Sequence, residues 1–259
     1  MSETLVYLIL GSRGSSRRDV VCDLVGFGLS ETDKALVAIS EGEPNQDPLE
    51  VRKREVVNRS YSWDGSDFEL EVTEDVSKIF VIADGASNPA DFVEAFHVWW
   101  QASGFDFGRV LTVLNCDLFH RHKELNVWFD CCIHYSDMVL LSERQDVPNK
   151  WISDLIERYE KGCFPCTFEY VKKGRISNPV QVLFPESRRI SMIFDTPEEV
   201  TIDLDDYVVL DEEENEIEVE EEEDKSIAGD PTKDTYLKRI ANGRRDKPVP
   251  QIGPFLKDA

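Results

Sequence analysis

The stretch Leu5 to Arg18, LVYLILGSRGSSRR, decides the fold that we predict for this chain. Residues 5–10 are apolar and end at a glycine, a pattern typical of a buried strand. Apolar residues recur at helical spacing over residues 19–25, so a helix should follow the glycine- and serine-rich loop. A strand, a tight loop and a helix N-terminus bring backbone N–H groups to one point, which suits an anion.

The loop keeps only part of a phosphate-binding motif. That motif reads G-x-x-x-x-G-K-[ST], in which Lys reaches the β- and γ-phosphates and the hydroxyl binds Mg²⁺. Gly11 matches the first glycine, whereas Ser16 stands for the second, Arg17 for the Lys and Arg18 for the hydroxyl residue. The sequence therefore predicts the anion cradle with its catalytic groups changed.

Length and charge limit the class of protein. A chain of 259 residues has room for one domain of roughly 170 to 200 residues and an extension. The net charge of −23 and the pI near 4.5 argue against nucleic acid or a membrane surface as a partner, since both require a positive face. The chain has no long apolar run and opens without a leader, so we expect a cytoplasmic protein whose six cysteines are reduced thiols.

Apolar runs of strand length recur along the chain, and helix-periodic segments separate most of them. Weaker alternation at residues 55–60 and 68–72 predicts an antiparallel pair at a sheet edge. This order predicts a three-layer α/β fold with a mainly parallel sheet covered on both faces. The other predicted strands are residues 5–10, 34–40, 78–83, 109–116, 137–141 and 166–171, and the other predicted helices are 90–101, 118–135 and 148–159.

Several short strings keep the frame of one family's motifs. Residues 11–19 align without a gap with a loop motif close to G-F-L-G-[SA]-G-K-T-T. Residues 82–89 follow E-x-x-G-x-x-x-P, with Ile82 in place of the Glu, and residues 109–115 follow V-V-T-V-V-D, with Asn115 in place of the Asp. Over residues 4–175 the chain thus resembles the CobW family of P-loop GTPases, relatives of the urease and hydrogenase accessory GTPases.

The departures from that family bear on its chemistry. The base-reading N-K-x-D has become Ser142-Glu143-Arg144-Gln145, and the family's metal-binding C-x-C-C is absent, since residues 45–79 contain no Cys. Arg18 would repel Mg²⁺, and only Asp84 is near enough in sequence to compensate. We therefore expect a degenerate member, a pseudo-GTPase whose need for Mg²⁺ is doubtful.

The resemblance implies a nucleotide- or phosphate-binding protein with weak or no GTP hydrolysis, acting in metal or cofactor delivery. GTP or another phosphate compound would be its ligand. The alternative is a non-enzymatic interaction module that keeps the fold and has lost the ligand. No catalytic and no metal-binding residue is predicted, and the predicted ligand-binding residues are Gly11, Gly14, Ser15, Ser16, Arg17, Arg18, Asp84 and Gly85.

Each of these features also has an ordinary structural explanation. The loop could be a plain strand-to-helix turn, and its arginines could only neutralise acidic surface. The pair Cys163 and Cys166 lacks two ligands for a structural Zn²⁺. The two missing ligands could come from Cys131 and Cys132 with His134, or with His120 and His122. Two pairs of buried structural thiols are the favoured interpretation.

Beyond residue 175 we predict two further parts. Residues 176–202 should form a β-hairpin extension, from apolar runs at 179–184 and 189–194. Residues 203–259 should be an acidic disordered segment and a C-terminal tail, since 203–224 hold fourteen acidic and no basic residues. This run is either a solvated linker or a polyanionic arm, which would bind a basic protein partner, collect cations or fold back over the arginines of the 11–18 loop.

Overall fold

The computed structural model describes residues 4–51, 54–195 and 228–258. These fall into two units, Met1–Ile190 with Pro248–Ala259, and Ser191–Lys247. The acidic run predicted to be disordered, 203–224, lies outside the described residues. The first unit contains the sheet and the predicted loop.

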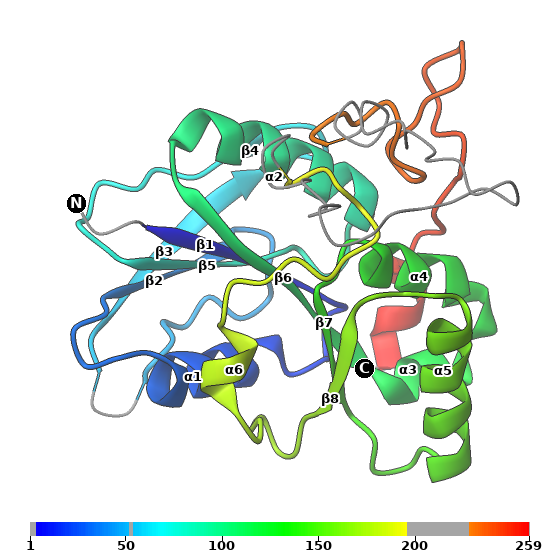
Figure 1. The fold of residues 1–259 in the computed structure, drawn as a ribbon, viewed down its shortest axis with the longest axis horizontal. Helices are drawn as coiled ribbons and strands as arrows, with labels where there is room; N and C mark the ends of the chain where they lie inside the picture. The colour runs from blue at the N-terminus through cyan, green and yellow to red at the C-terminus, as the bar shows by residue number, and fades with distance from the viewer. Residues whose placement is uncertain (1–3, 52–53, 196–227, 259) are drawn as a thin grey trace, which may run out of the picture. The chain divides into compact units, whose positions relative to one another are not determined.

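An eight-stranded sheet forms the centre of the first unit (Figure 1), with the strand order β4-β3-β2-β5-β1-β6-β7-β8. Every neighbouring pair is parallel except β3 and β4, which are antiparallel at one edge. The predicted strands are thereby confirmed. The antiparallel edge is shorter than predicted, since only Ser62–Trp63 pair with Phe68–Glu69, while residues 56–61 of β3 pair with β2 in parallel. The strands are β1 (Leu5–Leu10), β2 (Ala35–Ser40), β3 (Val56–Trp63), β4 (Phe68–Glu69), β5 (Lys78–Ile82), β6 (Asp106–Asn115), β7 (Met138–Ser142) and β8 (Thr167–Tyr170).

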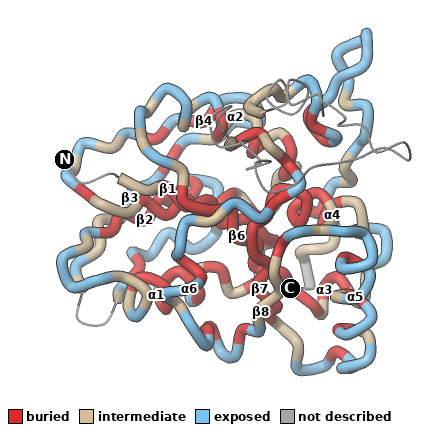
Figure 2. Tube along the Cα trace, in the orientation of Figure 1, coloured by how far each residue is buried: buried red, intermediate tan, exposed pale blue. Residues whose placement is uncertain are grey.

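Strand β1 is buried because it has a strand on each side and a helical layer on each face. It pairs with β5 and with β6, and residues 6–10 are at most 1% exposed. Figure 2 shows the buried residues gathered along these central strands. A strand covered on both faces cannot alternate polar and apolar residues, which explains the unbroken apolar run.

Helices cover both faces of the sheet and make the three layers that the sequence predicts (Figure 1). On one face, α1 (Arg17–Gly28) and the one-turn α6 (Pro179–Val182) pack on Tyr7 and Ile9 of β1. On the other lie α2 (Pro89–Ser103) and α4 (Asn126–His134). The remaining helical elements are α3 (Cys116–Arg121), η1 (Lys123–Leu125), α5 (Asn149–Lys161) and η3 (Gly253–Asp258).

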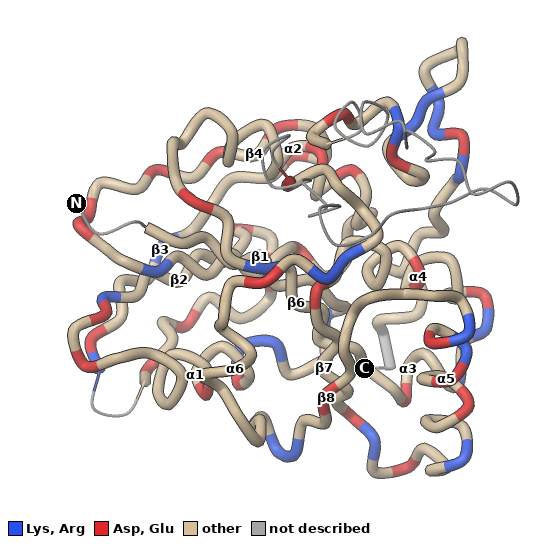
Figure 3. The backbone as a smooth tube through the Cα atoms, viewed as in Figure 1, with Lys and Arg blue, Asp and Glu red and all other residues tan. Residues whose placement is uncertain are grey.

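Most charged residues of the first unit lie in its loops and helices (Figure 3). In Figure 3 the central strands are largely free of charge, and both basic and acidic positions occur along α5. None of the helices in the described part of the chain is both long and apolar enough to cross a membrane.

The prediction of a single helix over residues 118–135 is wrong, because the helix is interrupted at His122. Helix α3 ends there, and α4 begins at Asn126 after the short η1 turn. The break lets Phe119 stack on Phe129 with ring centroids 4.4 Å apart. Ten residues of continuous helix would separate these rings by about 15 Å along the axis, so apolar packing between the two short helices replaces one long helix.

The hairpin predicted for residues 179–184 and 189–194 is also wrong. Its first half is helix α6, and no strand occurs among the described residues 183–195. Asn178 caps this helix by accepting from the Gln181 backbone N–H at 3.3 Å, and Pro179 occupies the first helical position. Proline there fits a helix start and lacks the N–H that a strand ladder requires.

A buried ion pair fastens the segment after α6 to the sheet. The Asp137 carboxylate is fully buried and lies 2.9 Å from Arg189 Nη1. It also accepts the backbone N–H groups of Val110 and Arg188, each at 2.7 Å. One carboxylate thus joins the start of β7, strand β6 and residues 188–189.

We predict that Asp137→Asn lowers the free energy of unfolding by about 3–5 kcal/mol, because it removes the charge of a fully buried carboxylate that pairs with the Arg189 guanidinium. Chemical denaturation would measure the change. Asp75→Asn is the matched control, since Asp75 is fully exposed and lies 3.9 Å from Lys34; it should leave the unfolding midpoint unchanged. Equal effects of the two substitutions would contradict the assignment.

Candidate functional site

The loops that carry the predicted site residues lie at one edge of the sheet. Parallel strands end at the same edge, so the segments after β1, β2, β5, β6 and β7 come together there. These segments contain residues 11–16, 41–47, 83–88, 116 onward and 143–147.

Sterics fix the glycine at the start of the first loop. Gly11 has a φ of 129°, and a Cβ there would lie 2.2 Å from the backbone oxygen of Val113. Gly14 has a φ of 76°, also in the region that favours glycine. The loop can therefore approach β6 this closely only with glycine at position 11.

A second glycine lets the segment after β5 touch the loop. A Cβ on Gly85 would lie 2.5 Å from the Arg13 backbone nitrogen and 2.7 Å from the Ser12 carbonyl carbon. The Arg13 N–H donates to the Gly85 oxygen at 3.1 Å. The absence of a side chain at Gly85 thus allows its backbone to contact the loop at Ser12 and Arg13.

Helix α1 begins at a hollow of about 500 Å³ beside the loop. Its N-cap, Ser16, is left-handed with a φ of 62° and makes no side-chain cap. The Ser16 hydroxyl donates instead to Glu143 Oε1 at 2.6 Å. The first-turn N–H groups and the positive end of the helix dipole therefore remain at the hollow. The lining residues are Arg13, Gly14, Ser15, Ser16, Arg17, Arg18, Asp19, Ile39, Glu43, Pro44, Asn45, Ile82 and Leu256.

Arg17, the first residue of α1, is buried, and its guanidinium binds two groups of the chain itself. Its Nη1 donates to the Ala83 oxygen, and its Nη2 lies 2.7 Å from Glu43 Oε1. The side chains of Arg17 and Glu43 are 5% and 11% exposed. This is a charge-assisted bond largely shielded from water, the strong kind of ion pair.

The other two loop arginines also bind the chain itself. Arg13 Nη2 lies 2.9 Å from Asp84 Oδ1 and donates to the Gly42 oxygen at 2.8 Å. Arg18 donates to the backbone oxygens of Asn45 and Asp47. The guanidinium groups of Arg13 and Arg17 are thus balanced by the carboxylates of Asp84 and Glu43.

The predicted ligand-binding residues fall into three groups around the hollow. Residues 14–18 line it, Gly11 and Gly85 shape the loop, and Asp84 holds Arg13. Their binding of a ligand stays a prediction. Sequence reasoning missed Glu43, for which the available signal was the run Glu41-Gly42-Glu43 directly after a buried strand.

The segment that begins at the end of β7, residues 142–145, supports the loop. Ser142 donates to the Ser15 oxygen at 2.9 Å, and Glu143 accepts the Ser16 hydroxyl. Arg144 turns toward β8, where its guanidinium lies 4.4 Å from the centre of the Tyr170 ring. Asn115, the last residue of the neighbouring strand β6, also contacts the loop: its Nδ2 donates to the Gly14 oxygen at 3.1 Å.

The residues at the loop do not fit a Mg²⁺ ion. Arg18 stands where a hydroxyl ligand would be needed. Asp84 already accepts from Arg13, from the Ala86 N–H at 3.1 Å and from the Ser87 hydroxyl at 2.7 Å. Within residues 4–51, 54–195 and 228–258, no three His, Cys, Asp or Glu side chains are grouped so as to hold a metal.

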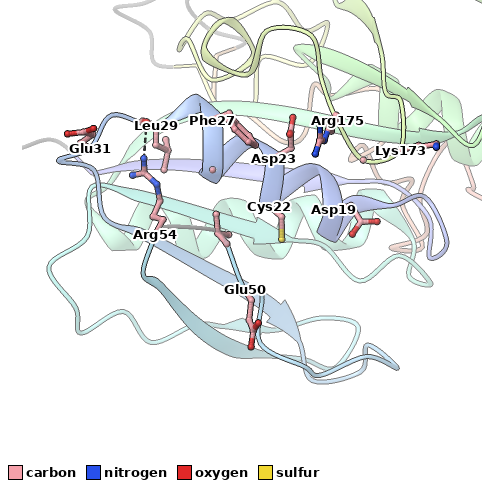
Figure 4. Close-up of a pocket in the computed structure, with 13 residues that line it drawn as sticks. Asp19, Cys22, Asp23, Phe27, Leu29, Glu31, Glu50, Arg54, Lys173 and Arg175 are labelled. Carbon is pink, nitrogen blue, oxygen red and sulfur yellow. Dashed lines mark hydrogen bonds between the residues drawn. The ribbon is translucent and has the colours of Figure 1, made fainter.

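A second and larger hollow, of about 760 Å³, runs along the outer side of α1 (Figure 4). It is lined by carboxylates such as Asp19 and Asp23 and by cations such as Arg54 and Arg175. Asp23 accepts the Ile176 N–H at 2.9 Å, and Arg54 donates to the Leu29 oxygen at 3.0 Å. Its mixed charges are partly used within the fold, so it presents no convergent set of ligand-binding groups.

The six cysteines are free thiols with different exposure. Cys163 is exposed, whereas Cys116 and Cys166 are buried, and burial raises the pKa of each of these two thiols to about 12. Burial also raises the pKa of the half-buried Cys22. The thiol pair at 163 and 166 is therefore split between surface and interior.

No protein-family model and no curated protein sequence matches this chain. Two solved structures are similar to it in overall trace. A zinc-bound triple mutant of the YjiA GTPase is 15% identical with a TM-score of 0.47, and the match covers 71% of this chain and 62% of that one. The zinc-bound YjiA GTPase from E. coli is 12% identical with a TM-score of 0.44, covering 73% and 67%. This chain therefore spans less than two thirds of the length of the first.

We predict that maleimide at pH 7.5 labels Cys163 first. A thiol with a pKa near 12 has almost no thiolate at this pH, and the thiolate is the nucleophile. Labelling of Cys116 and Cys166 should therefore be slow until the protein is unfolded. Peptide mass spectrometry over a time course measures the order, and Cys163→Ser should remove the fast phase. A fast phase at Cys116 or Cys166 in the folded protein would contradict the burial.

Proposed function

We propose that this chain is a CobW-like nucleotide- or phosphate-binding protein with weak or no GTP hydrolysis. The observation that carries the proposal is the start of α1, where Arg17 and uncapped backbone N–H groups face a hollow behind a loop shaped by Gly11 and Gly14. A helix N-terminus and guanidinium groups are good partners for a phosphoryl group.

The proposed ligand is GTP or another phosphate compound, bound through its phosphates. Arg17 is the main side-chain contact, because its guanidinium can hold a phosphate without a metal ion. The substitutions in Ser142-Glu143-Arg144-Gln145 remove the expected base-reading groups, so selectivity for guanine should be weak. A role in metal or cofactor delivery in the cytoplasm rests on the family resemblance, and the six free thiols agree with that compartment.

The residues at the loop also favour slow GTP hydrolysis. Hydrolysis in this class depends on Mg²⁺ and a Lys at the β- and γ-phosphates. Arg17 and Arg18 stand in those places, and Asp84 is occupied by Arg13, Ala86 and Ser87. Both charge stabilisation and metal placement are therefore weakened.

A specific observation favours a second function, an interaction module without ligand. Arg13 and Arg17 are already neutralised by Asp84 and Glu43. A site whose cations have internal partners has less attraction for an external anion. The acidic run at 203–224 would then bind a basic protein partner.

We predict that the protein binds inorganic phosphate or GTP in calorimetry, and that Arg17→Ala weakens binding about tenfold or more, the loss expected for one charge-assisted bond. Arg17→Lys should restore part of the affinity. Arg158→Ala is the control, since Arg158 lies on α5 and pairs with Asp130; it should leave binding unchanged. Absence of binding to every phosphate compound would favour the interaction module.

We predict that GTP turnover by the pure protein is at least about 100-fold below that of a GTPase with an intact Lys and Mg²⁺ site. Phosphate release with and without Mg²⁺ measures this rate. Gly14→Asp places a carboxylate in the loop and identifies any turnover that belongs to this site. Robust Mg²⁺-dependent turnover that Gly14→Asp abolishes would contradict the proposal.

A further inference from the structure

Residues 41–47, which follow β2, are held by all three arginines of the loop. Arg13 donates to the Gly42 oxygen, and Arg17 pairs with the Glu43 carboxylate. Arg18 donates to the oxygens of Asn45 and Asp47. Three side chains from the loop and the start of α1 thus converge on one seven-residue segment.

Glu43 differs from its neighbours in this segment. Residues 41–42 and 44–47 are all exposed, whereas the Glu43 side chain is only 11% exposed. An isolated buried carboxylate is costly unless it is paired. Glu43 is therefore turned inward by its contacts with the loop.

The contacts of Glu43 are those that a phosphate oxygen would make. Its Oε1 lies 2.7 Å from Arg17 Nη2 and 3.4 Å from the Gly85 backbone nitrogen, which donates to it. Its Oε2 lies 3.7 Å from Arg13 Nε. Two guanidinium groups and a backbone N–H thus surround one anionic group that lines the hollow at the start of α1.

The segment is also tied within itself. Gln46 Nε2 donates to the backbone oxygens of Ser40, Glu41 and Glu43 at 2.9, 3.2 and 2.7 Å. The turn is therefore preformed, and Glu43 and the carbonyls that bind Arg13 and Arg18 belong to one hydrogen-bonded turn.

We propose that residues 41–47 are a latch in which Glu43 occupies the phosphoryl position of the loop. A phosphoryl dianion binds only after Glu43 leaves Arg17 and the latch opens. This inference rests on the proposed function, and it adds a regulatory element to the same site. The ligand that opens the latch carries at least as much negative charge as the carboxylate that it replaces.

The latch lowers the apparent affinity of the site by the fraction of open molecules. Minor states of proteins are commonly populated at about 10% or less, which weakens binding about tenfold or more. Loss of the Glu43 charge should remove most of this penalty, because a neutral amide holds a guanidinium less strongly than a carboxylate does.

The test is calorimetric titration of the full chain with inorganic phosphate, at an ionic strength held constant with chloride. Glu43→Gln should bind phosphate about tenfold more tightly than the unchanged protein. Glu41→Gln is the matched control, since it removes the same charge from an exposed residue of the same segment, and it should bind as the unchanged protein does. The double variant Glu43→Gln with Arg17→Ala should lose the gain.

The outcomes separate the two ideas. Equal binding by the unchanged protein and Glu43→Gln overturns the latch and leaves the proposed function standing. Absence of binding in both, with inorganic phosphate and with GTP and with both proteins folded by circular dichroism, overturns the proposed function and the latch with it. An equal gain in Glu41→Gln assigns the effect to general charge and overturns the latch.

A second measurement uses the unchanged protein and needs no variant. Saturating phosphate should increase amide hydrogen exchange in residues 41–47, because the latch loses its contacts with the loop arginines. Exchange in the central strand β1 serves as the internal reference. Slower exchange in 41–47 on phosphate binding would mean that the segment closes over the ligand, and would overturn the latch.

Discussion

The site is organised by the buried guanidinium of Arg17. Its backbone begins α1, directly after the loop that follows β1. Its side chain reaches the Ala83 oxygen after β5 and the Glu43 carboxylate after β2. One cation thus joins the carboxyl ends of three strands, and because a buried charge must stay paired, these three segments depend on one another for their positions.

The central sheet could be predicted from the sequence, because parallel strands buried on both faces need unbroken apolar runs. The break at His122 and the helix at Pro179 could not. Apolar periodicity indicates which residues are buried, but it does not identify the residues against which they pack. It therefore could not predict that Phe119 stacks on Phe129. At residue 179 the capping pair Asn178 and Pro179 carried the helical signal, and the apolar run hid it.

The site was predictable where its causes are local. Gly11 and Gly14 serve the turn of their own loop, and the sequence marks both. Glu43 lies 26 residues from Arg17, in a turn-rich segment among other acidic residues, so nothing local selects it as the partner. Glu143 shows the same limit, since its substitution for Lys predicts lost base recognition, while the structure uses its carboxylate to hold the hydroxyl of Ser16.

The pairing of Arg13 and Arg17 with Asp84 and Glu43 also bears on how fast an anion can arrive. These four charges cancel at short range, so at a distance an approaching anion meets chiefly the field of a chain with a net charge of −23. Ions screen that field beyond about 8 Å at physiological salt. Association should therefore be slow in dilute buffer and faster as salt is added, the reverse of the electrostatic steering seen when opposite charges meet.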